Sequence, residues 1–201
     1  PTQFWTAELN ENIEQLQKEA YLIRENDKDG VIKSNSGFQG YHSKDIRDLN
    51  NLPGTNQLLK QIINAVNAIH QISRKGELQL TNFWINISGK GSSNTPHTHS
   101  GLTYSGVFFI KVPKEMKGGR FLFYRNFNEA DFISTEYMGH FKEGYQKKGY
   151  DYPINTISPK ENMLIVFPAW VPHAVEMNLS DEERISLSFN FKLNRTFSRV
   201  K

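Results

Sequence analysis

The chain has 201 residues, of which 24 are basic and 21 acidic, and 37% are hydrophobic, including a 12% share of aromatic residues. This composition is typical of a globular protein with a sizeable core, and the small, scattered positive charge does not favour nucleic acid as a partner. The absence of cysteine excludes disulfides, thiolate metal sites and a cysteine nucleophile.

Nothing in the hydropathy pattern indicates a membrane protein. No apolar run approaches the ~20 residues of a spanning helix, and the first residues, PTQFWTAELNEN, lack the basic and apolar regions of a signal peptide. We therefore expect a soluble, cytoplasmic protein without a membrane partner. The sequence does not indicate its oligomeric state.

Two helices are predicted in the first third of the chain. Residues 8–25 place Ile13, Leu16, Ala20 and Ile23 on one helical face. Residues 26–54 are polar and rich in Asn, Asp, Ser and Gly, which predicts a loop with a short strand or turn at 34–42. A second helix follows Pro53–Gly54, with Thr55 as its expected N-cap.

After residue 76 the pattern changes to short alternating segments that predict strands. These segments are 78–87, 104–112, 120–124, 162–167, 173–177 and 184–193. Helices followed by many strands predict a mainly β domain, a sandwich or open barrel with the helices buttressing one face. We expect one domain over 1–201, with a helical part at 1–76, a β core at 77–201 and a lid-like insertion at 125–152.

His97 and His99 lie one residue apart at the edge of an apolar strand. Alternate residues of a strand face the same side, so the two imidazoles can share a cavity and bind a metal such as Fe, Zn, Cu or Ni. His173, at the start of another predicted strand, is the best third ligand. The alternative is that these are surface or capping histidines.

Arg184 and Ser186 also alternate, on a strand that is otherwise apolar. A buried guanidinium must be paired, and a guanidinium beside a hydroxyl is a good receptor for a carboxylate. Alternatively, Arg184 reaches solvent or pairs with the acidic residues 181–183. Taken together, the residues predict a metal held by histidines with a carboxylic acid anchored behind it.

At this point the sequence resembles the 2-oxoglutarate/Fe(II)-dependent oxygenase superfamily, most of all the small oxygenases of marine bacteria and their phages. The resemblance lies in SNSGFQ (34–39), WINISGKG (84–91), HTHSGLTYSGVFFIKVP (97–113), GGRFLFY (118–124) and the block 162–193. In the last block, His173, ten residues and then Arg-x-Ser are the most specific feature.

The resemblance implies a double-stranded β-helix, or cupin-like jelly roll, that uses Fe(II), 2-oxoglutarate and O2. It implies that His97 and His173 are metal ligands and that Arg184 and Ser186 bind the far carboxylate of 2-oxoglutarate. Asn86 is expected to hydrogen-bond the cosubstrate. The implied activity is hydroxylation of a C–H bond, with release of succinate and CO2.

Position 99 departs from the superfamily, which usually has Asp or Glu there. Three interpretations are open. His99 replaces the carboxylate in a three-histidine site, which we favour; or it contacts the metal loosely and leaves a coordination position free; or a carboxylate from elsewhere completes the site.

Two other functions compete with this one. A cupin-type metal dioxygenase or isomerase that does not use 2-oxoglutarate would fit His97-x-His99 but not Arg184-x-Ser186, and a non-catalytic β-sandwich binding module would fit degenerate histidines. The substrate is expected to be a small molecule or a peptide, with a preference for a peptidyl or prolyl target.

Further residues are assigned to the pocket or excluded from it. We expect Phe108, Ile110, Phe167 and Trp170 to line the pocket or belong to the core. We expect substrate contacts from Tyr104, Arg125 and the 125–152 segment. The remaining histidines, His42, His70 and His140, are expected to be dispensable for metal, with His70 facing solvent.

Overall fold

The computed structural model describes residues 3–27, 30, 40–73, 76–124 and 155–194. It contains two helices, α1 (Ile13–Asn26) and α2 (Pro53–Ser73). Its strands are β1 (Trp5–Glu8), β2 (Tyr41–His42), β3 (Glu77–Ser88), β4 (Asn94–His97), β5 (Tyr104–Lys111), β6 (Phe121–Phe123), β7 (Asn155–Ile157), β8 (Met163–Pro168), β9 (His173–Val175) and β10 (Arg184–Asn194). Neither helix is both long enough and apolar enough, over the described residues, to span a membrane.

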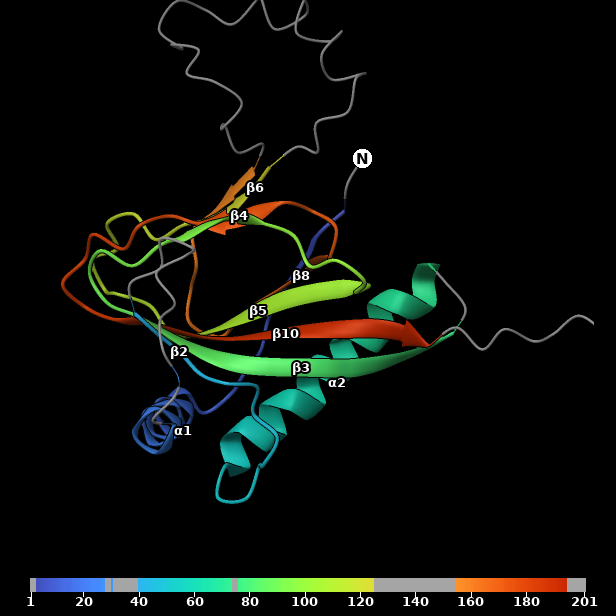
Figure 1. Cartoon of the computed structure of the whole chain (residues 1–201), viewed down its shortest axis with the longest axis horizontal. Coiled ribbons are helices and arrows are strands. Elements are labelled where there is room, and N and C mark those ends of the chain that lie inside the picture. Colours follow the sequence, from blue (N-terminus) through green and yellow to red (C-terminus); the bar gives the residue numbers. More distant parts are fainter. Residues whose placement is uncertain (1–2, 28–29, 31–39, 74–75, 125–154, 195–201) are drawn as a thin grey trace, which may run out of the picture.

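The strands form two sheets. The larger sheet has the order β1-β8-β5-β10-β3-β2 and the smaller one β4-β9-β6-β7, and neighbouring strands in both are antiparallel. The smaller sheet lies on one side of the larger sheet and the helices lie on the other (Figure 1). The long central strands β3 and β10 therefore have one face toward the helices and one toward the smaller sheet.

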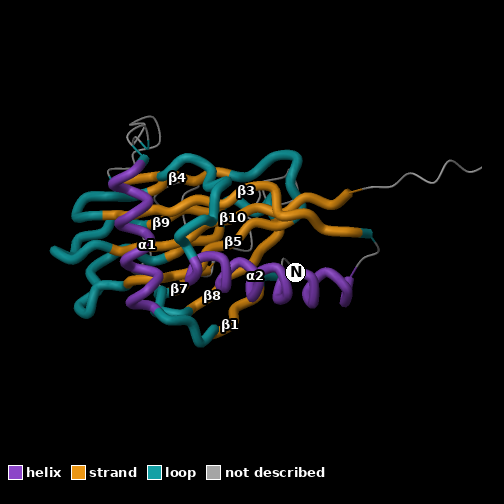
Figure 2. The backbone as a smooth tube through the Cα atoms, turned by 90° about the horizontal axis from the view of Figure 1, so that it is seen from below, coloured by secondary structure: helices purple, strands orange, loops and turns teal. Residues whose placement is uncertain are grey.

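The helix layer covers the outer face of the larger sheet, as Figure 2 shows. Leu16 of α1 and Leu58 and Ile62 of α2 are fully buried and belong to one apolar cluster with residues of β3, β5, β8 and β10. Apolar residues recur along both helices at helical spacing, so each helix buries one face on the sheet. This packing confirms the predicted buttress.

The start of α2 depends on a residue of α1. The helix begins at Pro53, two residues before the predicted N-cap Thr55, so Thr55 lies in the first turn. The backbone N–H groups of Gly54 and Thr55 donate to the carboxylate of Glu19 at 2.8 and 2.7 Å, and the Thr55 hydroxyl donates to it as well. Glu19 thus accepts hydrogen bonds from backbone amides that have no partner inside the helix. This cap comes from a residue distant in the sequence, and the spacing of residues did not indicate it.

The space between the two sheets is filled unevenly. A second apolar cluster occupies one part of it, formed by Val107, Phe109, Phe121, Phe123, Ile165, Phe167 and Val171. The other part is a cavity of about 380 Å³ bounded by the inner faces of β3, β5 and β10 and by residues of the smaller sheet.

The six predicted strands are present, each within a few residues of its expected limits. Strands β1, β4 and β7, of three or four residues each, were not among the predicted segments. Strands β1 and β2 pair with β8 and β3 of the larger sheet, so the part expected to be helical, 1–76, also contributes to the β core. The expected insertion at 125–152, with Arg125 and His140, lies outside the described residues.

Candidate active site in the cavity between the sheets

Three histidines meet at the edge of the cavity. His97 ends β4 and pairs directly across from His173, which begins β9, and their ring centroids are 4.3 Å apart. The ring of His99 lies 5.1 Å from each of the other two. The candidate ligand atoms of the three side chains all lie within 4.8 Å of one another, which is close enough for one metal ion to bind all three.

His99 is not on the strand, contrary to the simple alternation argument. Strand β4 ends at His97, and His99 is held instead by its backbone N–H, which donates to the carbonyl of Ala169 at 2.9 Å. The loop 98–103 thus hydrogen-bonds to the segment that leads to His173. The predicted grouping of the three histidines is present, although a loop and not a strand places the second one.

Hydrogen bonds at the second ring nitrogen orient two of the imidazoles. Nδ1 of His97 lies 2.8 Å from the carbonyl oxygen of Thr95, and Nδ1 of His173 lies 2.9 Å from that of Val171. A carbonyl can only accept, so each Nδ1 carries the hydrogen and each Nε2 keeps a free lone pair. Metal-binding histidines commonly have this arrangement.

The surroundings of the histidines favour the neutral ligand form. Burial, and then repulsion from His97, lowers the pKa of His99 to about 4. Burial also lowers the pKa of His173 to about 3, with a smaller contribution from His97. Neutral imidazoles are the form that binds metals. Within the described part of the chain, no carboxylate joins the three histidines as a further ligand.

Arg184 is the first residue of β10 and lies at the inner end of the cavity, away from the opening. Its side chain is only 4% exposed, Nη1 donates to the carbonyl of Gly119 at 2.7 Å, and Nη2 lies 3.5 Å from the hydroxyl of Ser88. Its Nε has no hydrogen-bond partner among the described residues. Burial lowers the pKa of Arg184 to about 10, which still leaves the guanidinium charged at neutral pH.

The acidic residues that could have neutralised Arg184 are engaged elsewhere. Asp181 pairs with Lys90 at 2.7 Å, and Glu183 accepts from Tyr21 and Arg24. Over the described residues Arg184 has no carboxylate partner, and it does not reach solvent. This excludes, for that part of the chain, the alternative in which Arg184 is a surface charge.

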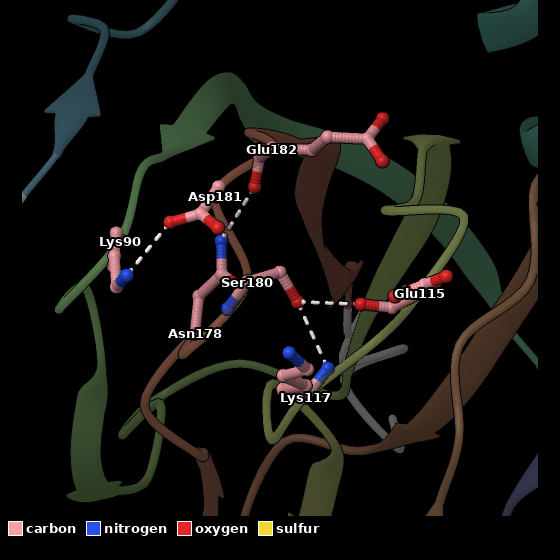
Figure 3. Close-up of polar contacts among 7 residues, drawn as sticks. All are labelled: Lys90, Glu115, Lys117, Asn178, Ser180, Asp181 and Glu182. Carbon is pink, nitrogen blue, oxygen red and sulfur yellow. Dashed lines mark hydrogen bonds and ion pairs between the residues drawn. The ribbon is translucent and has the colours of Figure 1, made fainter.

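A polar network connects the loops that contain Lys117 and Asn178 (Figure 3). The buried amide of Asn178 donates to the carbonyls of Ser88 and Glu182, and its side-chain oxygen accepts from the N–H of Ser180. The Ser180 hydroxyl in turn accepts from the backbone N–H of Lys117. A β-bridge between Asn178 and Gly118 places the next residue, Gly119, against Arg184. The network therefore fixes both groups that contact the guanidinium.

The two remaining predicted site residues also line the cavity. Ser186 follows Arg184 by two residues on the same face of β10, and Asn86 of β3 lies directly across from Ser186. Asn86 donates to the hydroxyl of Ser188 at 3.0 Å. The cavity thus combines all six predicted residues.

The other expectations had mixed outcomes. Of the residues expected in the pocket or the core, Phe167 lines the pocket and Phe108 and Ile110 belong to the core beneath the helices, whereas the expectation for Trp170 was wrong, because it is exposed. Tyr104 is buried against Trp5 and His70 rather than in the cavity. His70 is buried, not exposed, because α2 packs this part of its surface on the sheet.

Other cavity residues were missed. Asn82, Trp84, Ser105 and Asn190 lie at the outer end, together with His42 and Asp45. The first four are polar or amphipathic side chains at alternate positions of otherwise apolar strands, a signal that the sequence carries. No comparable pattern marks Asp45.

Comparison with known proteins gives the family and the fold. The model of the family described as "Putative 2OG-Fe(II) oxygenase" matches residues 82–190, whereas no curated protein matches the sequence. Among solved structures, a prolyl-4-hydroxylase from Pseudomonas putida is 15% identical with a TM-score of 0.63, over 96% of this chain and 94% of that one.

Two further solved structures are similar over most of this chain. A viral collagen prolyl hydroxylase from Paramecium bursaria Chlorella virus-1, in complex with 2-oxoglutarate, is 10% identical with a TM-score of 0.61, over 95% of this chain and 96% of its own. A prolyl hydroxylase from Trichoplax adhaerens, bound to a hypoxia inducible factor peptide, is 13% identical with a TM-score of 0.66, over 94% and 78%.

The predicted mainly β architecture, a double-stranded β-helix with buttressing helices, is confirmed by the two antiparallel sheets and by these similarities. The family match spans the three histidines, Arg184 and the strands that carry them. This chain belongs to the family of 2-oxoglutarate/Fe(II) oxygenases, enzymes whose metal, cosubstrate and oxidant are Fe(II), 2-oxoglutarate and O2.

Proposed function

We propose that the protein hydroxylates a C–H bond of its substrate, with Fe(II) bound by His97, His99 and His173 and 2-oxoglutarate anchored by Arg184. The observation that carries this proposal is the buried, charged and incompletely hydrogen-bonded Arg184 in the same cavity as three clustered histidines. A dicarboxylate such as 2-oxoglutarate would chelate the metal with one end and bind the guanidinium with the other, so it suits a cavity with both kinds of site.

The three histidines fit the metal in both geometry and protonation. Their candidate ligand atoms converge within 4.8 Å, and the backbone carbonyls at Thr95 and Val171 hold two rings with Nε2 available. When bound, the iron and cosubstrate supply oxidative decarboxylation of 2-oxoglutarate to succinate and CO2, coupled to oxidation of the substrate.

His99 has an electrostatic consequence in this role. A site with three neutral imidazoles has one more positive charge than a site with two histidines and a carboxylate. The additional charge favours the anionic cosubstrate and raises the reduction potential of the iron. His99 replaces the usual carboxylate in this proposal, since no acidic side chain of the described residues joins the cluster.

The inner end of the cavity suits the far end of 2-oxoglutarate. Phe109, Phe121 and Val107 form an apolar wall there, where a charge-assisted hydrogen bond is stronger than in water. Arg184 binds the carboxylate with the help of the Ser186 hydroxyl, and Asn86 hydrogen-bonds the cosubstrate closer to the metal. The protein thereby fixes the position of the cosubstrate and excludes water from it.

For the substrate, a peptidyl or prolyl target is supported by three of the similar solved structures, which are prolyl hydroxylases, one of them bound to a peptide. Fold similarity alone does not transfer a substrate. The preference therefore concerns only the class of targets to screen first.

The test is an anaerobic titration of the Fe(II)-loaded protein with 2-oxoglutarate, followed through the visible charge-transfer band of the chelate. We expect a band that saturates, and succinate release when O2 is admitted with a substrate. Bound iron without a band would support a cupin-type activity that does not use 2-oxoglutarate. A protein that binds no iron would instead be a binding module.

A further inference from the structure

The cavity is longer than the cosubstrate requires. Arg184 and Asn190 both line it, and they lie on one face of β10, six residues apart, which corresponds to roughly 20 Å at ~3.3 Å per residue. An extended 2-oxoglutarate measures only about 7 Å at ~1.5 Å per bond. The outer end, from the histidines to Asn190, is therefore available to the substrate.

A directed chain of hydrogen bonds lines this outer end. The Ser105 hydroxyl donates to Oδ1 of Asn190 at 2.6 Å, Nδ2 of Asn190 donates to Oδ1 of Asn82 at 3.0 Å, and Nδ2 of Asn82 donates to Oδ1 of Asp45 at 3.1 Å. Every donor in the chain points toward Asp45. The Asp45 carboxylate is therefore the last acceptor of the chain, at the cavity rim.

Asp45 is placed firmly although its side chain is exposed. The backbone N–H groups of Ser43 and Ile46 donate to the carbonyls of Ile85 and Phe83 at 2.9 and 3.0 Å, so this segment runs along the edge of β3. Asp45 is consequently held beside the inner face of that strand. Only one of its carboxylate oxygens has a hydrogen-bond partner within the described structure.

An aromatic pair lies between Asp45 and the histidines. Trp84 stacks on His42 with ring centroids 5.4 Å apart and planes 17° apart, and it lies 6.3 Å from the ring of His99. The face of an indole attracts cations, more strongly than that of any other side chain. The route from the rim to the metal cluster thus passes a carboxylate and then an indole.

The two ends of the cavity have opposite charges. Among the described lining residues, Asp45 is the one carboxylate, and Arg184 at the inner end is the one guanidinium or ammonium group. An anionic group is therefore attracted to the inner end, and a cationic group to the rim.

From this arrangement we propose that the outer end of the cavity binds a cationic group of the substrate, an ammonium or a guanidinium, between the Asp45 carboxylate and the Trp84 ring. This inference rests on the proposed function in one respect, namely that the cationic group belongs to the substrate of the oxygenase. The same chemistry could come from a basic peptide side chain or from a small free amine. Asn82 lines the same compartment, and the second N–H of its amide would suit a carbonyl of a peptide-like substrate.

Direct binding of small probes by calorimetry tests the inference without requiring turnover. The probes are Nα-acetyl-lysine methylamide, its uncharged analogue Nα-acetyl-norleucine methylamide, and n-butylamine. Each is titrated into the metal-free protein and into the anaerobic Fe(II)/2-oxoglutarate form. We expect the lysine probe to bind roughly tenfold more tightly than the norleucine probe, the difference due to one charge-assisted hydrogen bond.

Variants assign this preference to a residue. Asp45→Asn keeps the shape and the bond to Asn82 but removes the charge, and it should abolish the preference. Asp48→Asn is the matched control, because Asp48 is an exposed aspartate on the same segment that does not line the cavity, and it should keep the preference. Asp45→Lys should make the lysine probe the weaker ligand of the two.

The outcomes separate the two proposals. Equal binding of the charged and uncharged probes, no binding of the lysine probe, or a preference that survives Asp45→Asn would each overturn the cationic subsite, whether or not the charge-transfer band forms. A missing band would count against the oxygenase proposal alone. Binding of n-butylamine as tight as that of the lysine probe would support a small-amine substrate, and weaker binding a peptidyl one.

Discussion

The two faces of the larger sheet differ sharply, although they are built by alternate residues of the same strands. On β10, the residues toward the helices are Ile185, Leu187, Phe189 and Phe191, all apolar and buried. The residues toward the cavity are Arg184, Ser186, Ser188 and Asn190. Strand β3 repeats the pattern with Phe83, Ile85 and Ile87 on one face and Asn82, Trp84 and Asn86 on the other.

This difference shows how one sheet can serve two purposes. Successive side chains of a strand point to opposite faces, so stability and binding are assigned to neighbouring residues that share a backbone. We therefore expect substitutions on one face to change the free energy of unfolding and substitutions on the other to change ligand affinity. The predictions below test that separation.

The largest effect is expected from shortening a residue on the helix side. Leu187→Ala should lower the free energy of unfolding by roughly 2–5 kcal/mol, because it leaves a cavity in a fully buried site. The neighbouring Ser188→Ala removes only the hydrogen bond from Asn86, for a loss of about 1 kcal/mol. Urea unfolding curves measure both. Equal losses would contradict the separation of the two faces.

A proposed metal ligand should affect metal binding rather than stability. His99→Ala should weaken Fe(II) binding by more than roughly 100-fold, since changes beside a metal ligand can already cost that much. His99→Asp should restore much of the affinity if this position stands in for a carboxylate. His42→Ala, in the same cavity but outside the cluster, is the control. Competition with a chelator gives the affinities, and unchanged iron binding and turnover in His99→Ala would rule out the three-histidine site.

Arg184 should separate cosubstrate binding from metal binding. Arg184→Gln should weaken 2-oxoglutarate binding by roughly 10- to 100-fold, the value of a hydrogen bond to a charged group, while the metal content stays near that of the wild type. Arg120→Gln, which removes a half-exposed arginine paired with Glu176, serves as the control. The charge-transfer titration measures both variants. Loss of metal in Arg184→Gln would instead show that the arginine is structural.

A smaller effect on stability is expected in the helix layer. Burial alone would raise the pKa of Glu19, but hydrogen bonds from Gln15, Thr55 and Gly54 outweigh it and hold the pKa below its ordinary value of 4.5. Glu19→Gln should therefore cost roughly 0.5–2 kcal/mol at neutral pH.

This contribution of Glu19 should depend on pH with a definite sign. The depressed pKa means that the carboxylate stabilises the folded state above pH 4.5 and loses this contribution as the pH falls through the folded-state value. The stability difference between wild type and Glu19→Gln should thus shrink in acid. Urea unfolding at neutral and acidic pH measures it, with Glu14→Gln in the first turn of α1 as the control. A difference that is constant with pH would contradict the role of the charge.

Much of the fold could be predicted because hydrophobic periodicity is a local signal. The alternation in 184–193 indicates both the strand β10 and the face that carries Arg184 and Ser186. Strand β5 shows where this signal fails. Its residues from Val107 to Ile110 are all apolar, because both faces are buried, and the pattern therefore did not distinguish the helix-facing Phe108 from the cavity-facing Phe109.

The parts of the site that were missed depend on contacts between distant segments. Asp45 reaches the cavity because backbone hydrogen bonds hold its segment on β3, and Glu19 caps a helix that begins more than thirty residues later. Neither contact has a local sequence pattern. His70 was misplaced for a similar reason, since a polar residue near the end of a helix gives no sign that the sheet covers it.

The length of β10 has a consequence for how such a protein changes over time. Strand β10 begins with Arg184 and carries Asn190 six positions further on, and the three clustered histidines lie between these two ends of the cavity. If the two proposals hold, mutations near Asn190 would alter which molecules are accepted and leave Arg184 and the three histidines unchanged. New specificities could then arise by drift or by laboratory evolution at a handful of rim positions, without the catalytic apparatus having to be assembled again.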